Sequence, residues 1–254
     1  MSAVVLGHLS DLHLDGGAAA RDRVEAAVAH LARMAAGFTA VLVTGDVSDR
    51  GAAEDYETAG ALLSSLPVPV LLVPGNHDDR AAFASGLLGR DGHVPGAPVD
   101  QVVVAGAVRF VLLDSTVPGE PWGRLAPESL ALLAEAASTA DGLPTVVAFH
   151  HPPVALGIPE IDAIRLRDAD ELASVVRAHE RIVAVLCGHA HTAAAATFAG
   201  RPLRVAPGVR STAALPGEPS VGAMVPGAPP AAAVHVLRDG DLVTHVRAFS
   251  GFPS

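Results

Sequence analysis

The chain has 254 residues, of which 50% are hydrophobic and only 4% aromatic, and its formal net charge is −10. This length suits a single domain over residues 1–254 with a mainly aliphatic core, and the one cysteine, Cys187, excludes an intramolecular disulfide. The acidic balance without any Lys/Arg run argues against a long nucleic acid as partner, and because neither a basic leader nor 18 consecutive apolar residues occur, we expect a cytoplasmic protein outside the membrane.

Short apolar runs alternate with stretches of helical periodicity from residue 4 to residue 191. The pattern predicts, in order, a buried strand over 4–13, a helix over 18–36, a strand over 40–46, a helix over 52–65 and a strand over 69–76. It continues with two strands over 101–115 folded at 105–107, a helix over 127–139, a strand over 145–151, a helix over 168–179 and a strand over 182–191. This alternation predicts an α/β fold with the helices outside.

The last quarter, residues 201–254, is strand-like and rich in turns, with 244–249 as its final run, and we expect it to complete the strands of the same domain. Within it, residues 211–230 are rich in Pro, Gly and Ala. We expect an exposed loop there, and a flap that faces the substrate is the alternative.

Polar side chains follow five of the predicted strands at the point where each strand ends. In α/β sheets, loops converge at the carboxyl ends of strands and form the crevice where ligands bind. Carboxylate oxygens together with imidazoles suit Mn, Fe, Zn or Co better than Mg alone. Five such blocks in one chain predict a metal site; they comprise Asp11 and His13, Asp46 with Asp49 behind it, Asn76 and His77, His150 and His151, and His189 and His191.

These blocks resemble the motifs of the calcineurin-like metallophosphoesterase superfamily. They read DLH over 11–13, GDVSD over 45–49, GNHD over 75–78, HHPP over 150–153 and GHAH over 188–191. In order and spacing they are most similar to the bacterial class III cyclic-nucleotide phosphodiesterases. The resemblance implies a four-layer α/β/β/α sandwich with a dinuclear metal site at the carboxyl ends of the strands.

Residue by residue, the resemblance implies two sets of metal ligands. The first is Asp11, His13, Asp46 and His191, and the second is Asp46, Asn76, His150 and His189. Asp46 is then the bridging ligand, with one oxygen for each of two ions drawn from Mn, Fe, Zn and Co. Two such ions acidify a bridging water, and the resulting hydroxide would attack phosphorus.

Two residues that follow Asn76, His77 and Asp78, have supporting roles in this scheme. The resemblance implies that His77 is not a ligand and donates a proton or hydrogen bond to the leaving group. Asp78 orients the imidazole of His77 or caps the next helix, and these two readings stay open. His150 is assigned as ligand because it ends the apolar run, and the adjacent His151 is the alternative.

The resemblance implies a phosphodiesterase for small substrates, with 3′,5′-cyclic AMP or 2′,3′-cyclic nucleotides as candidates. Only 37 residues separate His151 from His189, too few for a cap domain over the site. A phosphomonoesterase or a glycerophosphodiester hydrolase on the same site is the alternative, and its extra cation would come from Arg50, Arg80, Arg167 or Arg210. A non-catalytic binding module is disfavoured, because such a protein would be expected to lack a ligand or His77.

The remaining histidines and the edges of the sheets give weaker expectations. His8 is expected to be a packed strand residue, with support of the metal site as the alternative. His30, His93, His179, His235 and His245 are expected at the surface or at helix ends. Apolar edge strands would permit a homodimer.

Overall fold

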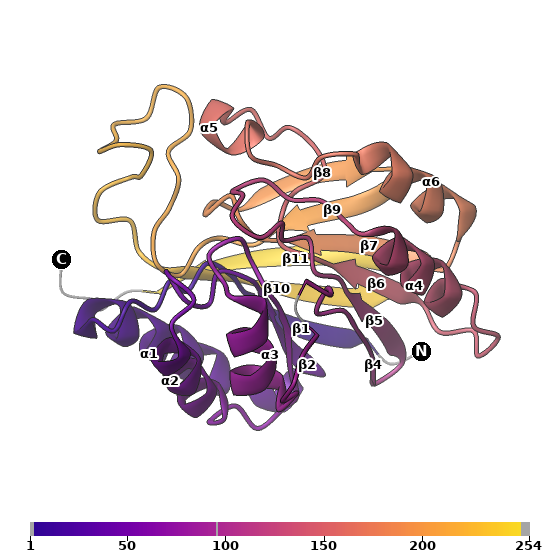
Figure 1. Ribbon diagram of the computed structural model, residues 1–254, viewed down its shortest axis with the longest axis horizontal. Coiled ribbons are helices and arrows are strands. Elements are labelled where there is room, and N and C mark those ends of the chain that lie inside the picture. Colours follow the sequence, from indigo (N-terminus) through magenta and orange to yellow (C-terminus); the bar gives the residue numbers. More distant parts are fainter. Residues whose placement is uncertain (1–2, 95, 250–254) are drawn as a thin grey trace.

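Two β-sheets lie face to face, and helices cover the outer face of each (Figure 1). The computed structural model describes residues 3–94 and 96–249, so both ends of the domain expected over 1–254 lie outside the described residues. That single-domain organisation stays a prediction. No helix in these two ranges is long and apolar enough to cross a membrane.

The first sheet has five strands in the order β11-β10-β1-β2-β3. Its strands are β1 (Val4–Leu9), β2 (Ala40–Thr44), β3 (Val70–Val73), β10 (Ala231–Arg238) and β11 (Asp241–Ala248). β1, β2 and β3 run parallel, and β10 and β11 add antiparallel strands at one side. The last quarter of the chain therefore completes the sheet that the first quarter begins.

The second sheet has six strands in the order β4-β5-β6-β7-β9-β8. Its strands are β4 (Gln101–Ala105), β5 (Val108–Leu112), β6 (Thr145–Ala148), β7 (Ile182–Cys187), β8 (Ala194–Phe198) and β9 (Arg201–Val205). β5, β6, β7 and β9 are parallel, whereas β4 and β8 pair antiparallel at the edges. The two strands expected over 101–115 are thus confirmed as a hairpin that turns at Gly106.

The helices divide between the two outer faces. Those of the first half are α1 (Ala18–Ala32), the 3-10 turn η1 (Ala35–Gly37), α2 (Ala53–Leu63) and α3 (Arg80–Leu88), and those of the second half are α4 (Pro127–Ala137), α5 (Pro159–Asp162) and α6 (Ala169–Ala178). One core cluster joins α1, α2 and α3 to the first sheet, and another joins α4 and α6 to the second. A third cluster lies between the sheets, which gives the expected α/β/β/α layers.

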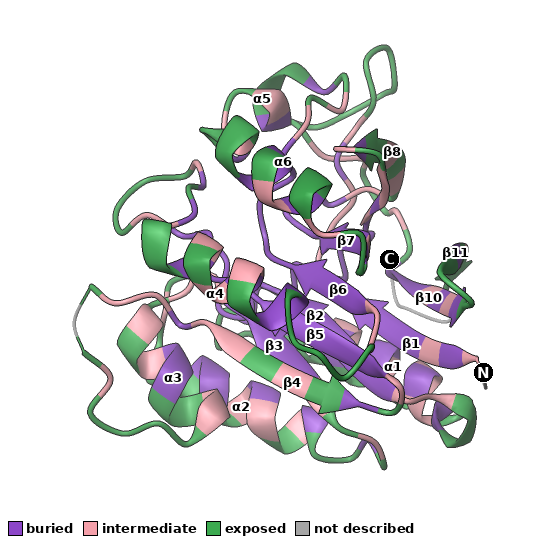
Figure 2. Cartoon of the chain, turned by 90° about the vertical axis from the view of Figure 1, so that its right-hand side faces the viewer, coloured by how far each residue is buried: buried purple, intermediate pink, exposed green. Residues whose placement is uncertain are grey.

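Alternating side chains explain why the strands read as continuous apolar runs. In β2, Val41 and Val43 pack toward the helices, while Leu42 belongs to the cluster between the sheets. In β6, Val147 packs toward the helices and Val146 toward the other sheet. Successive strand residues point to opposite faces, and both faces are covered, so each position is apolar. The central strands are accordingly buried along their length (Figure 2).

The predicted strands end earlier in the structure than in the sequence pattern. β1 ends at Leu9, β6 at Ala148 and β7 at Cys187, so the polar blocks that follow lie in loops. Helix α3 was not predicted, because its sequence is rich in Ala, Gly and Ser, and only Phe83 and Ala84 are buried. Residues 211–230 contain no named strand or helix and form the orange loop that projects at the upper left of Figure 1.

The expectation that His235 lies at the surface or a helix end is wrong. His235 lies on β10, fully buried, and its Nε2 is 2.9 Å from Nδ1 of His8 on β1. His8 Nε2 contacts Thr44 Oγ1 at 2.8 Å, and His235 Nδ1 contacts Thr244 Oγ1 at 2.8 Å. Both rings are hydrogen-bonded at both nitrogens, which is how a polar side chain is tolerated inside a core.

Candidate metal centre

The five polar blocks follow β1, β2, β3, β6 and β7, whose carboxyl ends meet at one end of the two sheets. Backbone hydrogen bonds join the first two loops, from Asp11 N–H to Gly45 O at 3.1 Å and from His13 N–H to Asp46 O at 2.9 Å. β7 and β6 are joined in the same way, because Gly188 N–H donates to His150 O at 3.0 Å. The blocks are thus held by main-chain bonds independent of any ligand.

Two glycines of the blocks allow the close approach. A Cβ at Gly75 would collide with Oδ1 of Asp46, and one at Gly188 would collide with Ser10 Oγ and the Thr44 carbonyl. Only a residue without a side chain fits where two backbones come this close. Close packing therefore requires Gly75 directly before Asn76 and Gly188 directly before His189.

The first group of candidate ligands comprises Asp11, His13, Asp46 and His191, all buried, with one ligand atom from each within 4.8 Å of the others. Nε2 of His13 lies 3.1 Å from Nε2 of His191, and Nε2 of His191 lies 3.5 Å from Oδ1 of Asp11. These are the four residues that the resemblance implies for the first metal.

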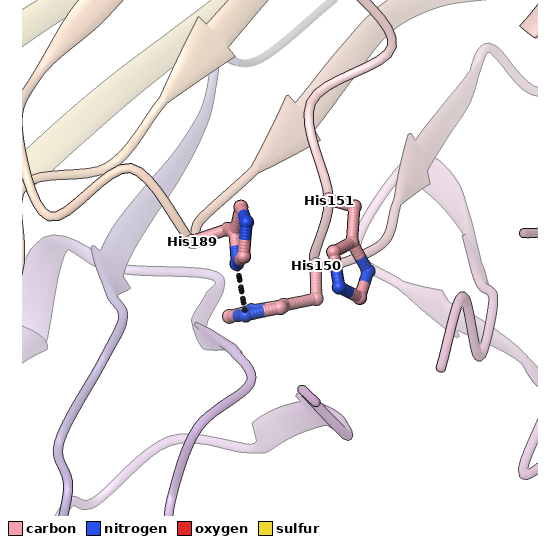
Figure 3. Close-up of side chains that lie close together, drawn as sticks. All are labelled: His150, His151 and His189. Carbon is pink, nitrogen blue, oxygen red and sulfur yellow. Dashed lines mark hydrogen bonds between the residues drawn. The ribbon is translucent and has the colours of Figure 1, made fainter. Parts of the chain in front are cut away.

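The second group centres on His150 and His189, which Figure 3 shows side by side. Nδ1 of His189 lies 3.2 Å from Nε2 of His150, and Nε2 of His150 lies 3.3 Å from Oδ2 of Asp46. Asn76, directly after β3, contributes a buried Oδ1. Thus His150 contacts both His189 and Asp46.

Asp46 lies between the two groups. Its Oδ2 is 3.4 Å from Nε2 of His13 and 3.3 Å from Nε2 of His150. Its Oδ1 instead accepts a hydrogen bond from the backbone N–H of His77 at 3.0 Å. The expectation of one carboxylate oxygen for each cation therefore differs from the structure, in which the same oxygen faces both groups.

Three of the candidate ligand imidazoles are oriented by a partner on Nδ1, which leaves Nε2 for the site. His13 Nδ1 donates to Oδ1 of Asp49 at 3.0 Å, and His150 Nδ1 donates to the carbonyl of Thr44 at 2.6 Å. His191 Nδ1 lies 2.8 Å from Ser211 Oγ. A carboxylate or carbonyl can only accept, so it fixes the proton on Nδ1 and the lone pair on Nε2, as is usual for metal-bound histidines.

Backbone strain is concentrated at the candidate ligands. Among the described residues, eight other than Gly have positive φ, and five of these are Asp11, His13, Asp46, His189 and His191. Non-Gly residues adopt this left-handed region at a cost, and such strain persists where the surroundings enforce it, commonly at functional sites. The loops are thus shaped to aim these side chains inward.

Burial and mutual contacts shift the pKa values of these groups. Burial alone would raise the pKa of Asp46, but the imidazoles of His150 and His13 hold that pKa well below its usual range. Burial lowers the pKa of His189 to about 3, with His150 adding to the effect, and burial likewise lowers the pKa of His13. In His150, burial acts in the same direction, but Asp46 outweighs it and raises the pKa to about 9. The ionised carboxylate of Asp46 and the neutral imidazoles of His13 and His189 are a donor set for a cation, and binding of a cation would release the proton of His150.

Buried donor atoms without a hydrogen bond also fit a cation. Both carboxylate oxygens of Asp11, Oδ1 of Asn76 and Nε2 of His189 have no hydrogen-bond partner among the described residues. Buried polar atoms are normally paired, because leaving one unpaired costs about 1–3 kcal/mol. Oxygen and imidazole donors gathered in one place fit divalent transition metals.

His77 lies beside the first group without belonging to the set of four. Its ring makes an edge contact with that of His13, with centroids 4.7 Å apart, and 41% of its side chain is exposed. Nδ1 of His77 donates to the backbone carbonyl of Asp49 at 2.9 Å. Its Nε2 is therefore the nitrogen left for a substrate.

Asp78 has neither of the roles expected from the sequence. Its carboxylate accepts hydrogen bonds from the backbone N–H groups of Val47, Ser48 and Gly75 at 2.8–3.2 Å, and from Tyr56 Oη at 3.2 Å. It ties the loop after β2 to the loop after β3. The imidazole of His77 is oriented instead by the main chain of Asp49, and α3 is capped by Asp79, whose side chain accepts from Ala82 N–H at 2.9 Å.

His151 lies in the same group as His150 and His189, with one ring nitrogen of each within 4.8 Å of the others, and the assignment of His150 as the ligand stays a prediction. The ring of His150 reaches toward His189, whereas the ring of His151 lies beside the chain with no dashed line to either neighbour (Figure 3). Nδ1 of His151 is 2.8 Å from Ser115 Oγ, and burial lowers the pKa of His151 well below its usual value. Only His150 also contacts Asp46.

Sequence reasoning missed several residues that shape the site. Ser211, Thr44 and Tyr56 contact His191, His150 and Asp78 respectively. Ser211 begins the Pro/Gly/Ala-rich loop, and nothing in that composition indicates a contact with a histidine 20 residues earlier. The GDVSD block did contain Asp49, the residue that orients His13.

Comparison with known proteins gives the family and the fold. The family model described as calcineurin-like phosphoesterase matches residues 4–193. A Rhodococcus erythropolis protein named "Probable cyclic nucleotide phosphodiesterase" is 36% identical over 79% of this chain and 69% of its own length. A glycerophosphodiester phosphodiesterase from Enterobacter lignolyticus is 35% identical over 60% of this chain, and the match spans just over half, 55%, of that relative. A dimetal phosphatase from Danio rerio has the same fold, with a TM-score of 0.73, 18% identity and 96% coverage of both chains.

Proposed function

Because the chain belongs to the calcineurin-like phosphoesterase family, we propose that it is a metal-dependent phosphodiesterase for small diesters, with cyclic nucleotides as its substrates. The candidates are 3′,5′-cyclic AMP and 2′,3′-cyclic nucleotides. One observation carries the proposal: Oδ2 of Asp46, in the buried group with Asp11, His13 and His191, also contacts His150 of the neighbouring buried histidine group, and a partly exposed His77 stands next to them. A cytoplasmic location and a homodimer stay predictions.

The proposed site holds two cations. Asp11, His13, Asp46 and His191 would hold one, and Asp46, Asn76, His150 and His189 would hold the other. Bound there, the cations would supply Lewis-acid polarisation of the phosphoryl oxygens and lower the pKa of water. Mn, Fe, Zn and Co all suit these ligands.

Hydrolysis of the diester consumes one water, whose oxygen forms a new bond to phosphorus while the bond from phosphorus to the leaving oxygen breaks. The electron pair goes to the leaving oxygen, which needs a proton. We assign this proton donation to the doubly protonated form of His77: its Nδ1–H is held by the Asp49 carbonyl, so the second ring proton is on Nε2 and goes to the leaving oxygen. The proton that the attacking water releases balances the one that His77 gives up. Proton transfer by a positioned side chain contributes about 10²–10⁴-fold to the rate.

The arginines near the site favour a diester over a monoester. Binding of a monoester dianion usually requires additional cationic side chains in the pocket. Arg80 is not available for this, because its Nε is 2.6 Å from Oδ2 of Asp114 and its other nitrogens donate to backbone carbonyls. Arg50 pairs with Asp49 at 3.6 Å and has 86% of its side chain exposed. The two remaining candidates are also engaged: Arg167 lies 3.8 Å from the centroid of the Trp122 ring, and Arg210 is 3.3 Å from Asp15.

Glycerophosphodiester hydrolysis is the second candidate, and the similarity to the Enterobacter lignolyticus enzyme favours it. It would use the same residues, since only the alcohol differs. A non-catalytic binding module has less support, because a scaffold would not need an oriented histidine beside the donor cluster.

The test is a hydrolysis assay on Mn²⁺-loaded protein, with a chelated control for each substrate. The substrates are bis-p-nitrophenyl phosphate, p-nitrophenyl phosphate, 3′,5′-cyclic AMP and glycerophosphoethanolamine. We expect turnover of bis-p-nitrophenyl phosphate and cyclic AMP, little of the monoester, and none after chelation. Strong monoester turnover with cyclic AMP untouched would reassign the protein to the phosphatases.

A further inference from the structure

A pocket of about 420 Å³ opens on the side of the metal centre where His77 lies. Asn76 and His77 form the end of it that adjoins the candidate ligands. The rest of its wall includes Arg50, Ala81, His93, Val117 and Pro118, which come from four separate stretches of the chain. None of these five residues belongs to the two ligand groups.

The place of His77 indicates what this pocket holds. A proton donor to the leaving oxygen must lie on the leaving-group side of the phosphorus atom. Since His77 forms part of the pocket wall, the alcohol side of the substrate lies in the pocket when the phosphoryl group lies at the ligand cluster. The pocket is therefore continuous with the reaction centre.

We propose that this pocket is a nucleoside subsite, in which a planar nucleobase with its ribose is bound while the phosphate lies at the metal centre. This inference rests on the proposed phosphodiesterase function and deepens it by naming the residues that select the substrate. The volume of the pocket falls in the range of roughly 300–1,000 Å³ that is typical of pockets for drug-sized ligands. Glycerol or ethanolamine would fill only a small part of it.

The charges in the pocket suit a neutral group. Arg80 is neutralised by Asp114, and its NH1 donates to the carbonyl of Gly96 at 2.9 Å. Asp79 is occupied in capping α3 through Ala82 N–H. A second phosphate on the substrate would meet no cation there except Arg50, which already pairs with Asp49.

Two planar side chains in the wall suit a nucleobase. The guanidinium of Arg50 is largely exposed, and the ring of His93 is fixed by a 2.9 Å contact between its Nε2 and the carbonyl of Ala97. Guanidinium and imidazole planes stack on flat heteroaromatic rings. Val117, Pro118 and Ala81 add apolar surface, against which a base loses contact with water.

The test compares the binding of inorganic phosphate, adenosine 5′-monophosphate and adenosine to Mn²⁺-loaded protein by titration calorimetry. Phosphate reports the metal centre alone, and the monophosphate reports the centre and the pocket together. The key variant is Ala81→Trp, because Ala81 is exposed on α3 and its replacement adds a bulky side chain to the pocket wall while every candidate ligand is kept. Ser85→Trp is the matched control, one turn further along α3, exposed and outside the pocket wall.

In the unmodified protein we expect the monophosphate to bind at least tenfold more tightly than phosphate. Ala81→Trp should remove this advantage and leave phosphate affinity within about twofold, whereas Ser85→Trp should change neither. Arg50→Lys keeps the charge and loses the plane, so it should weaken the monophosphate several-fold more than phosphate.

Provided that the unmodified protein hydrolyses bis-p-nitrophenyl phosphate, two results would overturn the nucleoside subsite without contradicting the proposed function. One is equal affinity for phosphate and the monophosphate in the unmodified protein, and the other is an undiminished advantage in Ala81→Trp. If the metal-loaded protein hydrolyses no phosphoester, the proposed function fails, and the subsite fails with it.

Discussion

The carboxylate of Asp49 accepts a hydrogen bond from Nδ1 of His13 at 3.0 Å, while the backbone carbonyl of the same residue accepts one from His77 at 2.9 Å. A single residue thus orients a candidate ligand through its side chain and the candidate proton donor through its main chain. Only the first of these contacts can be removed by substitution, so the two roles can be separated.

Asp49→Ala is expected to lower metal affinity about 10–100-fold, because the partner that orients His13 is lost. The turnover number at saturating Mn²⁺ should stay within a few-fold, since the carbonyl that holds His77 remains. Metal titration followed by assay at saturation measures both quantities. Asp49→Asn should have a smaller effect, and unchanged metal affinity in Asp49→Ala would contradict the role of the carboxylate.

Asp46→Asn should empty both cation positions, because Oδ2 of Asp46 faces both His13 and His150. Asp11→Asn is the matched comparison, since Asp11 belongs to the first group only and should leave about one ion bound. Elemental analysis of the purified variants gives the metal content. Equal losses in the two variants would refute the bridging position of Asp46.

His77→Ala should keep both cations and lose about 10²–10⁴-fold in turnover of cyclic AMP, because the proton donor to the leaving oxygen is gone. The loss should be smaller for bis-p-nitrophenyl phosphate, whose nitrophenolate leaves without needing a proton. His245→Ala is the control, because His245 is exposed on β11. Full activity of His77→Ala on cyclic AMP would remove His77 from the mechanism.

Asp78→Asn should destabilise the fold, because an amide NH₂ would replace one of two oxygens that both accept from backbone N–H groups, Oδ1 from Ser48 and Oδ2 from Gly75. The expected loss is about 1–3 kcal/mol of unfolding free energy, the usual cost of an unsatisfied buried group. Asp79→Asn is the adjacent control, because Asn caps a helix about as well as Asp. Denaturant unfolding of the two variants measures their free energies of unfolding, and equal midpoints would contradict the structural role of the Asp78 carboxylate.

The buried pair His8 and His235 should make stability fall in mild acid. Burial lowers the pKa of His235 to about 3, and burial also lowers the pKa of His8, with the neighbouring His235 adding to the effect. Because the folded pKa lies below the unfolded value of about 6.5, the stability is fully present above that pH and is lost as pH falls toward 3. At pH 5, His235 alone should have lost about 2 kcal/mol.

His235→Gln removes this titration, so its unfolding free energy should fall less between pH 7 and pH 5 than that of the unmodified protein. Denaturant unfolding at both pH values measures the difference. Parallel pH profiles for the two proteins would show that His235 is not buried in its neutral form.

The sequence predicted the layers and the blocks but not the contacts between distant segments. Apolar runs such as 40–46 and 145–151 indicated strands covered on both faces, and these strands are β2 and β6. Helix α3 escaped prediction because its interior is short of large apolar residues. His235 was misplaced because its burial depends on pairing with His8, 227 residues away.

The sequence by itself determined which residues stand at the carboxyl ends of the strands, because apolar periodicity and polar blocks are properties of neighbouring residues. Only the tertiary structure decided the direction of each side chain. In the folded protein, Oδ2 of Asp46 faces both ligand groups, and the carboxylate of Asp78 accepts hydrogen bonds from the backbone of two loops. The ring of His77 is oriented by the backbone carbonyl of Asp49. These outcomes follow from how loops from different strands pack against one another, and a carboxylate in one loop accepts from whichever donors the fold brings within about 3 Å.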